Sequence, residues 1–590
     1  MANEHISNSK ERLIRFLKTG TDKSFFLPGK NKHFQYVGNA MTQMINDGRG
    51  LEAVECIKKV HSEKLFLKLD PMLMFLALAC HSNNDMAVKK AAYALVEIVC
   101  ETPVELFKWL KQVKTCSQLT KGIGRGLRST VSNWYNSKDP MQVAEFVTRY
   151  KNVGNWSHKD VFRLCHVKPA NDSIAFIIKV VCKGLKSATE AYKEPSADIQ
   201  KLITYFEAVD FVRHTEDGFA AAMKLEEMEL HKEHIPVSLL SSKEIWNSLL
   251  LNMPVGEVLS SLPALSRRGF LTVPDGKAQE DPIVREICHK VLQRLKDSEA
   301  IEKEKISPYF IYIAIRNYVH VFSEVKTYHH GKGGSRKREN PSNNGPVSSS
   351  SPSQGKKKKR KGRKTEEGQG DAMTTEKKEE AGMTAKARAN NPELYDAIHD
   401  AFKVAVEKNT STTGKSYLLA VKTAGSEFQK GIRGTPSISA LEVMSLMATI
   451  LKNKERNVDL GFFTATLSPM KFPSELDNII EEIYSRAVPD LTLACDPAAP
   501  VTWALEKKKH YDVFLVMSDG AETLGEDSPA SKLLEYRQQM NLPDTKMVLC
   551  GLAAPKLDFA QASGMLDIGG FDATVPSLIH QFITGKLDTL

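Results

Sequence analysis

Cationic side chains recur at helical spacing in the stretch WSHKDVFRLCHVKP, residues 156–169. Lys159, Arg163 and His166 follow one another at intervals of four and three residues, so a helix would carry them on one face, about a turn apart. No acidic residue shares that row. Such a row suits the phosphates of a nucleic acid better than ion pairs within the helix, so these residues are predicted to contact phosphate.

The same stretch carries signals for both ends of its helix. Ser157 is a suitable N-cap, and Asp160 three residues later completes a capping box. Pro169 is predicted to stop the helix, because proline lacks an amide hydrogen and clashes with the preceding turn. We therefore expect a short helix that begins after Ser157 and extends to about Pro169.

Positive charge is concentrated in this part of the chain. The protein has 590 residues and a net charge of +10, and residues 111–190 alone hold 14 Lys and Arg against 5 Asp and Glu. Residues 331–390 hold 16 against 7, whereas residues 391–590 are acidic, with 19 against 26. A local excess of this kind indicates an anionic partner. The alternative interpretation of residues 111–190 is a charged, solvated face of an ordinary helical protein.

A long helical region must position these cations. From about residue 10 to 325, apolar residues recur at helical period in segments such as MLMFLALAC and SIAFIIKVVCKGL, separated by short polar or proline-containing turns. Successive helices with short connections predict an α-solenoid of stacked antiparallel pairs, although no repeat signature stands out. Trp134 and Trp156 are expected to be core residues rather than platforms for stacked bases.

Residues 329–390 have a different composition. They are rich in Gly, Ser, Pro and Lys and lack periodic apolar residues, so they are predicted to be disordered. The run KKKKRKGRK at 356–364 is typical of a nuclear-localisation signal or a nucleic-acid-binding patch. A solubilising linker is the alternative interpretation.

The C-terminal part alternates between strands and helices. A first helix is expected at about 392–408. Buried strands are predicted at 416–421, 459–463, 512–517 and 546–551, and further helices at 439–452, 474–487 and 528–540. This alternation predicts a doubly wound parallel sheet with a ligand site at the C-terminal ends of its strands.

Cysteine usage and hydropathy indicate the cellular compartment of the protein. The nine cysteines are odd in number, form no CxxC pair and lie mostly in apolar runs, which indicates reduced core residues of a cytosolic or nuclear protein. Neither a signal peptide nor an apolar run of about 18 residues is apparent, so secretion and membrane spanning are not expected. The expected location is the cytoplasm, with nuclear entry through residues 356–364 as an alternative.

Several blocks resemble the TROVE module of the Ro (SS-A) autoantigen family, ribonucleoproteins that bind Y RNAs. These blocks are INDGRG (45–50), PMLMFLALA (71–79), GIGRGLRS with WYN (122–136), the stretch 156–169, SKEIWNSLLLNMP (242–254) and ISPYFIYIA (306–314). The C-terminal part resembles the von Willebrand factor A-type domain that follows TROVE in this family. Its blocks are TGKSYLLAV (413–421), DVFLVMSD (512–519), EYRQQM (535–540), VLCG (548–551) and GMLDIGGFD (564–572).

The resemblance implies an architecture and its boundaries. An α-helical ring of HEAT-like repeats would span residues 10–328, followed by the disordered basic insertion at 329–390 and a closing helix of the ring at 391–410. An α/β doubly wound A-type domain at 411–590 would bridge the two ends of the ring.

The resemblance also implies partners and site residues. The protein would bind small non-coding RNAs, with Y RNA on the outer basic surface and the single-stranded 3′ ends of misfolded RNAs in the ring cavity, in RNA quality control and ribonucleoprotein assembly. Lys159 and Arg163 occupy the positions of the family's RNA-contacting Lys and Arg. Further candidate RNA-binding residues are His158, His166, Lys168, Lys121, Arg125 and Arg128.

An A-type domain would also imply a divalent-metal site built from an Asp-x-Ser-x-Ser loop, a Thr in a second loop and a later Asp, because Mg²⁺ prefers hard oxygen ligands. Here Lys422 replaces the first Asp and Ala424 the first Ser, whereas Ser426 and Asp519 are retained. In the second loop, Cys495 replaces the Thr, unless Thr492 is the matching residue instead. The residue that occupies the Thr position of the pattern therefore stays open.

An ammonium group in place of a carboxylate opposes binding of a divalent cation, so no metal and no other cofactor are expected. Lys422 is predicted to pair with Asp519 and to form a metal-free site. The alternative is that Lys422 points to solvent.

No catalytic constellation is apparent. TGKS at 413–416 ends like a phosphate-binding loop, but it lacks the first glycine and precedes a strand instead of a helix. The sequence therefore predicts a monomeric RNA-binding protein that is not an enzyme, with protein partners possible through the A-type domain and no membrane partner. The alternatives are an A-domain interaction scaffold without a specific RNA ligand and, less favoured, a nuclease with an unrecognised site.

Overall fold

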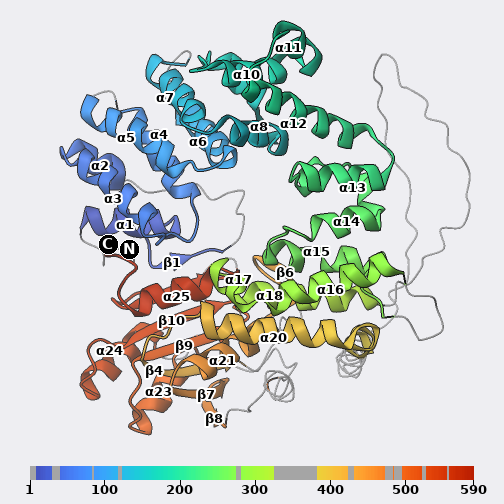
Figure 1. The fold of residues 1–590 in the computed structure, drawn as a ribbon. Helices are drawn as coiled ribbons and strands as arrows, with labels where there is room; N and C mark the ends of the chain where they lie inside the picture. Colours follow the sequence, from blue (N-terminus) through green and yellow to red (C-terminus); the bar gives the residue numbers. More distant parts are fainter. Residues whose placement is uncertain are drawn as a thin grey trace, which may run out of the picture.

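A ring of helices, closed by an α/β domain, forms the protein (Figure 1). The computed structural model describes residues 8–28, 40–82, 85–116, 123–273, 281–323, 382–422, 431–471, 483, 495–520, 527–554 and 557–590. No helix in these ranges is both long and apolar enough to span a membrane.

The helices follow one another around the ring. Its first half contains α1 (Ser9–Thr19), α2 (Ala40–Asn46), α3 (Gly50–Ser62), α4 (Asp70–Cys80), α5 (Met86–Val99), α6 (Pro103–Cys116), α7 (Arg125–Asn136), α8 (Pro140–Arg149) and α9 (His158–Leu164). Its second half contains α10 (Asp172–Lys183), α11 (Leu185–Ala191), α12 (Ala197–His214), α13 (Gly218–Glu227), η1 (Lys232–His234), η2 (Val237–Ser241), α14 (Lys243–Leu249), α15 (Val255–Arg267), α16 (Pro282–Lys296), α17 (Ser298–Lys303), α18 (Pro308–Val319), η3 (His320–Phe322) and α20 (Pro392–Asn409). Helix α4 packs on α5 and α6, and α14 packs on α13 and α16, as in a solenoid.

The α/β domain is built on a seven-stranded sheet in the order β1-β11-β10-β9-β4-β7-β8. The strands are β1 (Phe25–Phe26), β4 (Ser416–Lys422), β7 (Asn457–Phe463), β8 (Leu467–Met470), β9 (Val513–Ser518), β10 (Lys546–Gly551) and β11 (Met565–Gly569). All neighbours are parallel except β7 and β8. The helices of this domain are α21 (Ala440–Lys454), α23 (Ala499–Glu506), α24 (Pro529–Gln539) and α25 (Val575–Ile583). The predicted doubly wound parallel sheet is confirmed.

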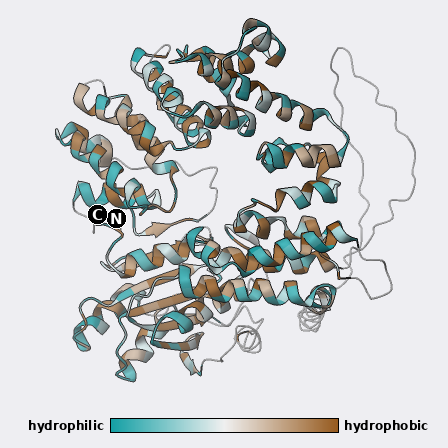
Figure 2. Cartoon of the chain, in the orientation of Figure 1, coloured by the Kyte–Doolittle hydropathy of each residue, from teal (hydrophilic) through white to brown (hydrophobic). Residues whose placement is uncertain are grey.

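The sheet is buried on both faces, which explains its long apolar strands. Figure 2 shows these strands as mostly hydrophobic. Because side chains alternate along a strand, Leu419 and Val421 of β4 face one core, whereas Leu418 and Ala420 face the other. The first of these cores continues into the helical ring, so the ring and the sheet share buried apolar side chains.

The N-terminal end of the ring is fastened to the α/β domain by backbone and ionic contacts. Strand β1 pairs in parallel with β11 and extends the sheet by one strand. Arg15 forms a two-pronged ion pair with Asp588, in which its Nη2 donates to Oδ2 at 2.6 Å. The buried Lys18 ammonium donates to the backbone carbonyls of Lys586 and Thr589 at 2.7 and 2.6 Å.

The other end of the ring meets the domain through α18 and α20, both of which lie along its boundary (Figure 1). Arg316 of α18 lies 2.6 Å from Glu442 at the start of α21, and Tyr312 donates a hydrogen bond to the same carboxylate at 3.1 Å. Glu442 also caps α21 by accepting from the amide and hydroxyl of Ser439. The ring is therefore closed at both ends by the α/β domain.

Several predicted boundaries need correction. The region predicted to be helical throughout contains β1 and a small hairpin of β2 (Asn152–Val153) and β3 (Trp156–Ser157). Residues 382–390, predicted to be disordered, are helical. Ala387 in this helix is fully buried, and its carbonyl accepts a hydrogen bond from the Tyr318 hydroxyl, so contacts with α18 stabilise the segment. The remainder of the insertion, and all of the predicted helix 474–487 except residue 483, lie outside the described residues.

Candidate nucleic-acid interface

The helix that carries the first cations begins as its sequence predicts. Ser157 lies in extended conformation and accepts a hydrogen bond from the amide of Asp160 at 3.2 Å, while Asp160 accepts from the amide of Ser157 at 3.1 Å. This reciprocal capping box fixes the direction in which α9 leaves the β2–β3 hairpin. Lys159 and Arg163, four residues apart on α9, are both exposed.

The helix ends earlier than expected. It stops at Leu164, and His166 adopts a left-handed conformation with φ of 49°. The amide of Val167 then donates back to the carbonyl of Phe162 at 3.2 Å, which closes the last turn. The prediction that His166 continues the helical row of Lys159 and Arg163 is therefore wrong, although His166 is exposed just beyond the helix.

His158 was expected at the surface, but it is a core residue. Only 3% of it is exposed, and its Nδ1 lies 2.8 Å from the Tyr135 hydroxyl. Its ring packs edge-on against Phe107 with centroids 4.9 Å apart. Burial lowers the pKa of His158 to about 4, so the imidazole is neutral at physiological pH. A neutral, buried imidazole cannot contact phosphate, and its assignment to the RNA-binding set is wrong.

Lys168 is held beside α7 through its backbone. Asn136 donates from Nδ2 to the Lys168 carbonyl at 2.9 Å, and Asn136 Oδ1 accepts from the amide of Ala170 at 3.0 Å. The Lys168 amide donates to Ser132 Oγ at 3.4 Å. Ser132 and Asn136 are thus positioning residues that sequence reasoning missed. Their spacing of four on α7 is the signal that could have identified them.

The earlier basic block lies on α7, the helix whose Ser132 and Asn136 hold the segment after α9. Arg125 is exposed at the start of α7, and Arg128 is half-buried one turn later. Burial raises the pKa of Cys165, the C-cap residue of α9, to about 11, and the positive charge of Arg128 partly offsets this rise. Arg128 therefore lies close to the end of α9. Lys121 lies outside the described residues.

We call the five described cations of this surface the basic cluster. Its members are Arg125, Arg128, Lys159, Arg163 and Lys168. They come from α7, α9 and the segment after α9, and none of their side chains has an ion-pair or hydrogen-bond partner among the described residues. The Nε of Arg128 is buried without a hydrogen-bond partner in that part of the chain.

Among the described residues, no acid of the range 111–190 forms an ion pair with the basic cluster. Asp139 caps α8 by accepting from the amide of Met141 at 2.8 Å, and Asp160 caps α9. Asp172 lies in the first turn of α10, where its negative charge interacts favourably with the positive end of the helix dipole. Glu145 pairs with Arg149 at 2.7 Å. Four of the five acids in residues 111–190 are accounted for in this way.

The tryptophans of this region are not stacking platforms. Trp134 is fully buried and donates from Nε1 to the carbonyl of Cys100 at 2.6 Å, which confirms it as a core residue. Trp156 is half-buried in β3 and packs against the apolar core. The nine cysteines, all within the described residues, form no disulfide with one another, and six of them are buried.

The carboxyl ends of β4 and β9 hold an ion pair where an A-type domain would hold a metal. The Lys422 ammonium lies 2.7 Å from Asp519 Oδ1, and the two side chains are 4% and 1% exposed. The predicted pairing is confirmed, and the solvent-facing alternative is wrong. An ammonium at this position repels a divalent cation, so these residues do not fit a metal site.

Most of the remaining positions of that site lie outside the described residues. Cys495 is buried, whereas Ala424, Ser426 and the alternative Thr492 lie outside the described residues. No group of three or more His, Cys, Asp or Glu residues in the described ranges is arranged to hold a metal ion.

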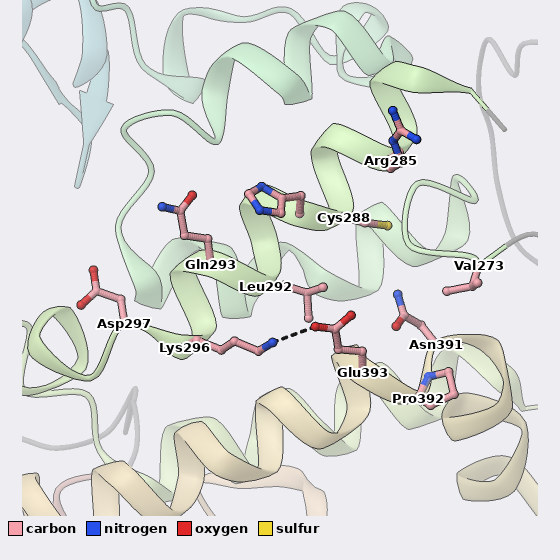
Figure 3. Close-up of a pocket in the computed structure, with 11 residues that line it drawn as sticks. Val273, Arg285, Cys288, Leu292, Gln293, Lys296, Asp297, Asn391, Pro392 and Glu393 are labelled. Atoms are coloured by element: carbon pink, nitrogen blue, oxygen red, sulfur yellow. Dashed lines mark hydrogen bonds and ion pairs between the residues drawn. The ribbon is translucent and has the colours of Figure 1, made fainter.

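A pocket of about 940 Å³ lies between α16 and the start of α20 (Figure 3). Lys296 bridges it by an ion pair of 2.7 Å to Glu393, so this cation is already neutralised. Asn391 at its rim caps α20 and donates to the carbonyl of Leu271. The pocket shares no residue with the basic cluster.

Comparison with known proteins gives matches over nearly the whole chain. A TROVE domain model matches residues 39–217 and 191–415, and a Ro60 vWA domain model matches residues 416–583. A Caenorhabditis elegans relative named RNA-binding protein RO60 is 24% identical, with 98% of this chain and 88% of the relative covered. A relative of the same name from Deinococcus radiodurans is 23% identical, with 98% and 93% covered.

A solved structure shares the fold. The crystal structure of the Deinococcus radiodurans RO (RSR) protein superposes with a TM-score of 0.75 at 22% identity, covering 98% of this chain and all of that one. The TROVE model alone matches well over half of the chain. The chain therefore belongs to the TROVE-domain family, with a Ro60-type vWA domain at its C-terminus.

Proposed function

We propose that this protein binds RNA through the basic cluster. The observation that carries the proposal is that five cations lie on α7, α9 and the segment after α9, which α7 holds through Ser132 and Asn136, and that no acid of the described residues pairs with them. Lys and Arg in such a setting supply phosphate contacts that do not depend on sequence. Two relatives that carry the name RNA-binding protein RO60 support this assignment.

The proposed ligands are small non-coding RNAs. Y RNA-like molecules would bind the outer basic surface, and single-stranded 3′ ends of misfolded RNAs would enter the ring. Such binding would serve RNA quality control and ribonucleoprotein assembly. The protein would act as a monomer, since its own C-terminal domain closes the ring, and would work in the cytoplasm, with nuclear entry through the basic run 356–364.

We further propose that the protein is not an enzyme. Binding through phosphate contacts requires positioned cations but no group that attacks, protonates or deprotonates the RNA. Of the described histidines, His61, His158 and His234 are buried, and burial lowers the pKa of His158 and His234 to about 4. None of these three imidazoles is placed to act on a ligand at the surface.

The test is a binding titration with a structured small RNA that carries a single-stranded tail, repeated over a series of salt concentrations. We expect the double variant Lys159→Ala/Arg163→Ala to lose about tenfold or more in affinity, because each charged hydrogen bond contributes on the order of 1.5 kcal/mol or more. The slope of log affinity against log salt should fall by roughly 1.5, since each lost phosphate contact removes about 0.7 to 0.9.

A matched control removes two lysines of equal charge elsewhere. Lys224 on α13 is partly exposed and pairs with Glu227, and Lys403 on α20 is exposed and pairs with Asp400. Lys224→Ala/Lys403→Ala should bind RNA like the wild type. Equal binding by wild type and the Lys159/Arg163 variant would refute the site.

The alternative function is a protein-interaction scaffold built on the vWA domain, without a specific RNA ligand. It predicts no RNA binding above that of an unrelated basic protein at physiological salt. Sequencing the RNA that copurifies with the intact protein distinguishes the two, and shortening of the bound RNA during incubation would contradict the non-enzymatic assignment.

A further inference from the structure

The buried Lys422–Asp519 pair has a consequence for the vWA domain that is independent of RNA binding. The pair lies at the carboxyl ends of two adjacent central strands, β4 and β9, which is where a parallel sheet places its ligand sites. Asp519 is followed by Gly520, whose φ of 101° and close approach to Ala554 leave no room for a side chain. The turn therefore holds Asp519 in a fixed position at this edge.

A divalent cation at this edge needs anionic oxygen ligands and an open coordination position. The retained Asp519 supplies one carboxylate, but an ammonium already lies against it and no coordination position is open. The Lys422 ammonium lies against the Asp519 carboxylate at 2.7 Å, and both side chains are almost completely buried. A ligand approaching from solvent cannot reach either group, and a cation would meet the ammonium first.

Neighbouring parts of the same edge contact the helical ring. Phe571, just after β11, packs against Tyr309 of α18 with ring centroids 5.2 Å apart. Asp572 lies 3.8 Å from the ammonium of Lys68, which belongs to the ring. This edge of the sheet therefore already forms an interface within the chain.

We infer that in this protein the Lys422 ammonium replaces the divalent cation of the vWA domain, so that the edge of the sheet is a metal-independent structural site that supports closure of the ring. A buried ammonium–carboxylate pair neutralises Asp519 as a metal ion would, but it leaves no position for an external ligand. The domain would then hold its shape equally well with and without divalent cations.

The test uses the full-length protein and measures its melting temperature in EDTA and in millimolar Mg²⁺ or Mn²⁺. The expected result is no shift in the wild type and no saturable Mn²⁺ binding by electron paramagnetic resonance. A cation-dependent rise in melting temperature that Asp519→Asn abolishes would overturn the inference.

Two substitutions of Lys422 test the role of its ammonium group directly. Lys422→Met removes the charge but keeps the length of the side chain, so the melting temperature should fall and remain insensitive to cations. Lys422→Asp places a second carboxylate beside Asp519, and a divalent cation should relieve their repulsion and raise the melting temperature by several degrees. Absence of any cation response in Lys422→Asp would show that the ammonium does not stand in the place of a cation.

A matched control is available at the opposite end of the same strand. Lys415 is half-exposed and lies 4.0 Å from Asp512, so Lys415→Met should change neither the melting temperature nor its response to cations. If Lys422→Asp does not fold, the cation titrations of the wild type and Asp519→Asn decide the question. RNA binding by the wild type plays no part in these measurements.

Discussion

At the scale of single residues, the chemistry of the interface depends on which charged groups remain exposed. His158 and Lys159 are adjacent in the chain, yet the first is buried against Tyr135 and the second is in solvent. This division follows from the helix, since successive residues point about 100° apart. The neutral histidine anchors α9 to the core, and the cations beside it remain available for phosphate.

Buried histidines should make the stability of the protein depend on pH. Burial lowers the pKa of His158 and His234 to about 4, whereas in the unfolded chain both titrate near 6.5. The unfolded state therefore binds more protons between these values, so stability should fall as pH drops from about 6.5 to 4 and stay level above that window. Each histidine contributes up to roughly 3 kcal/mol.

The measurement is the melting temperature of the wild type and His158→Gln across this window. The variant should lose at most about half of the pH dependence, because His234 and His61, whose pKa values burial also lowers, remain. Carboxyl groups such as Glu145 contribute to the pH dependence of stability mainly below this window. Hydrogen bonds from His231 and Arg149 hold the pKa of Glu145 at about 2, so its contribution to stability is lost only as pH falls below about 4.5. An unchanged pH dependence in His158→Gln would contradict the assignment of His158 as a buried neutral residue.

At the scale of elements, the orientation of the basic cluster depends on how α9 begins and on how the next segment is held. The capping box of Ser157 and Asp160 fixes the start of the helix, and Asn136 of α7 holds the backbone at Lys168 and Ala170. Cations on separate elements are thereby kept in one surface, although none of these positioning groups is itself a cation.

Loss of the cap should weaken RNA binding indirectly. Ser157→Ala removes the hydrogen bond to the amide of Asp160, which costs about 1 kcal/mol in helix stability. We expect a loss of affinity of about tenfold at most, with an unchanged salt dependence, because no phosphate contact disappears. A reduced salt slope in Ser157→Ala would mean that the hydroxyl or its neighbours contact phosphate directly. The same titration as for Lys159→Ala/Arg163→Ala supplies the comparison.

At the scale of the whole molecule, closure of the ring joins residues that are far apart in the sequence. Arg15 pairs with Asp588 at one junction, and Arg316 pairs with Glu442 at the other. The α/β domain is acidic overall, whereas the surface that carries the basic cluster is not. RNA should therefore be drawn to the helical side of the ring and repelled from the domain that closes it.

The second junction provides a test of closure. Arg316→Met removes the cation that faces the buried Glu442 carboxylate, and an uncompensated buried charge costs about 3 to 5 kcal/mol. We expect a lower melting temperature and a larger radius of gyration by small-angle X-ray scattering as the junction loosens. Arg388→Met removes an exposed pair with Asp396 and should change neither quantity. An unaltered radius and melting temperature in Arg316→Met would show that this junction does not hold the ring.

Local signals in the sequence determined several parts of this protein without help from the tertiary structure. The spacing of Ser157 and Asp160 predicted the start of α9, because a capping box involves only neighbouring residues. Apolar runs predicted four strands of the sheet, since a strand buried on both faces must be apolar throughout. The ion pair of Lys422 with Asp519 was predicted through the resemblance to A-type domains rather than from a local signal, with a solvent-facing Lys422 as the alternative.

Only the tertiary structure decided which of these residues reach solvent and how the chain closes on itself. His158 belongs to the same stretch as Lys159, and its burial depends on Tyr135 and Phe107 from other helices. The left-handed turn at His166 ends α9 before its proline, which residue types alone did not reveal. Strand β1 has two residues and forms because β11 offers a free edge. Such outcomes depend on contacts between distant segments, and periodicity and capping describe only neighbours.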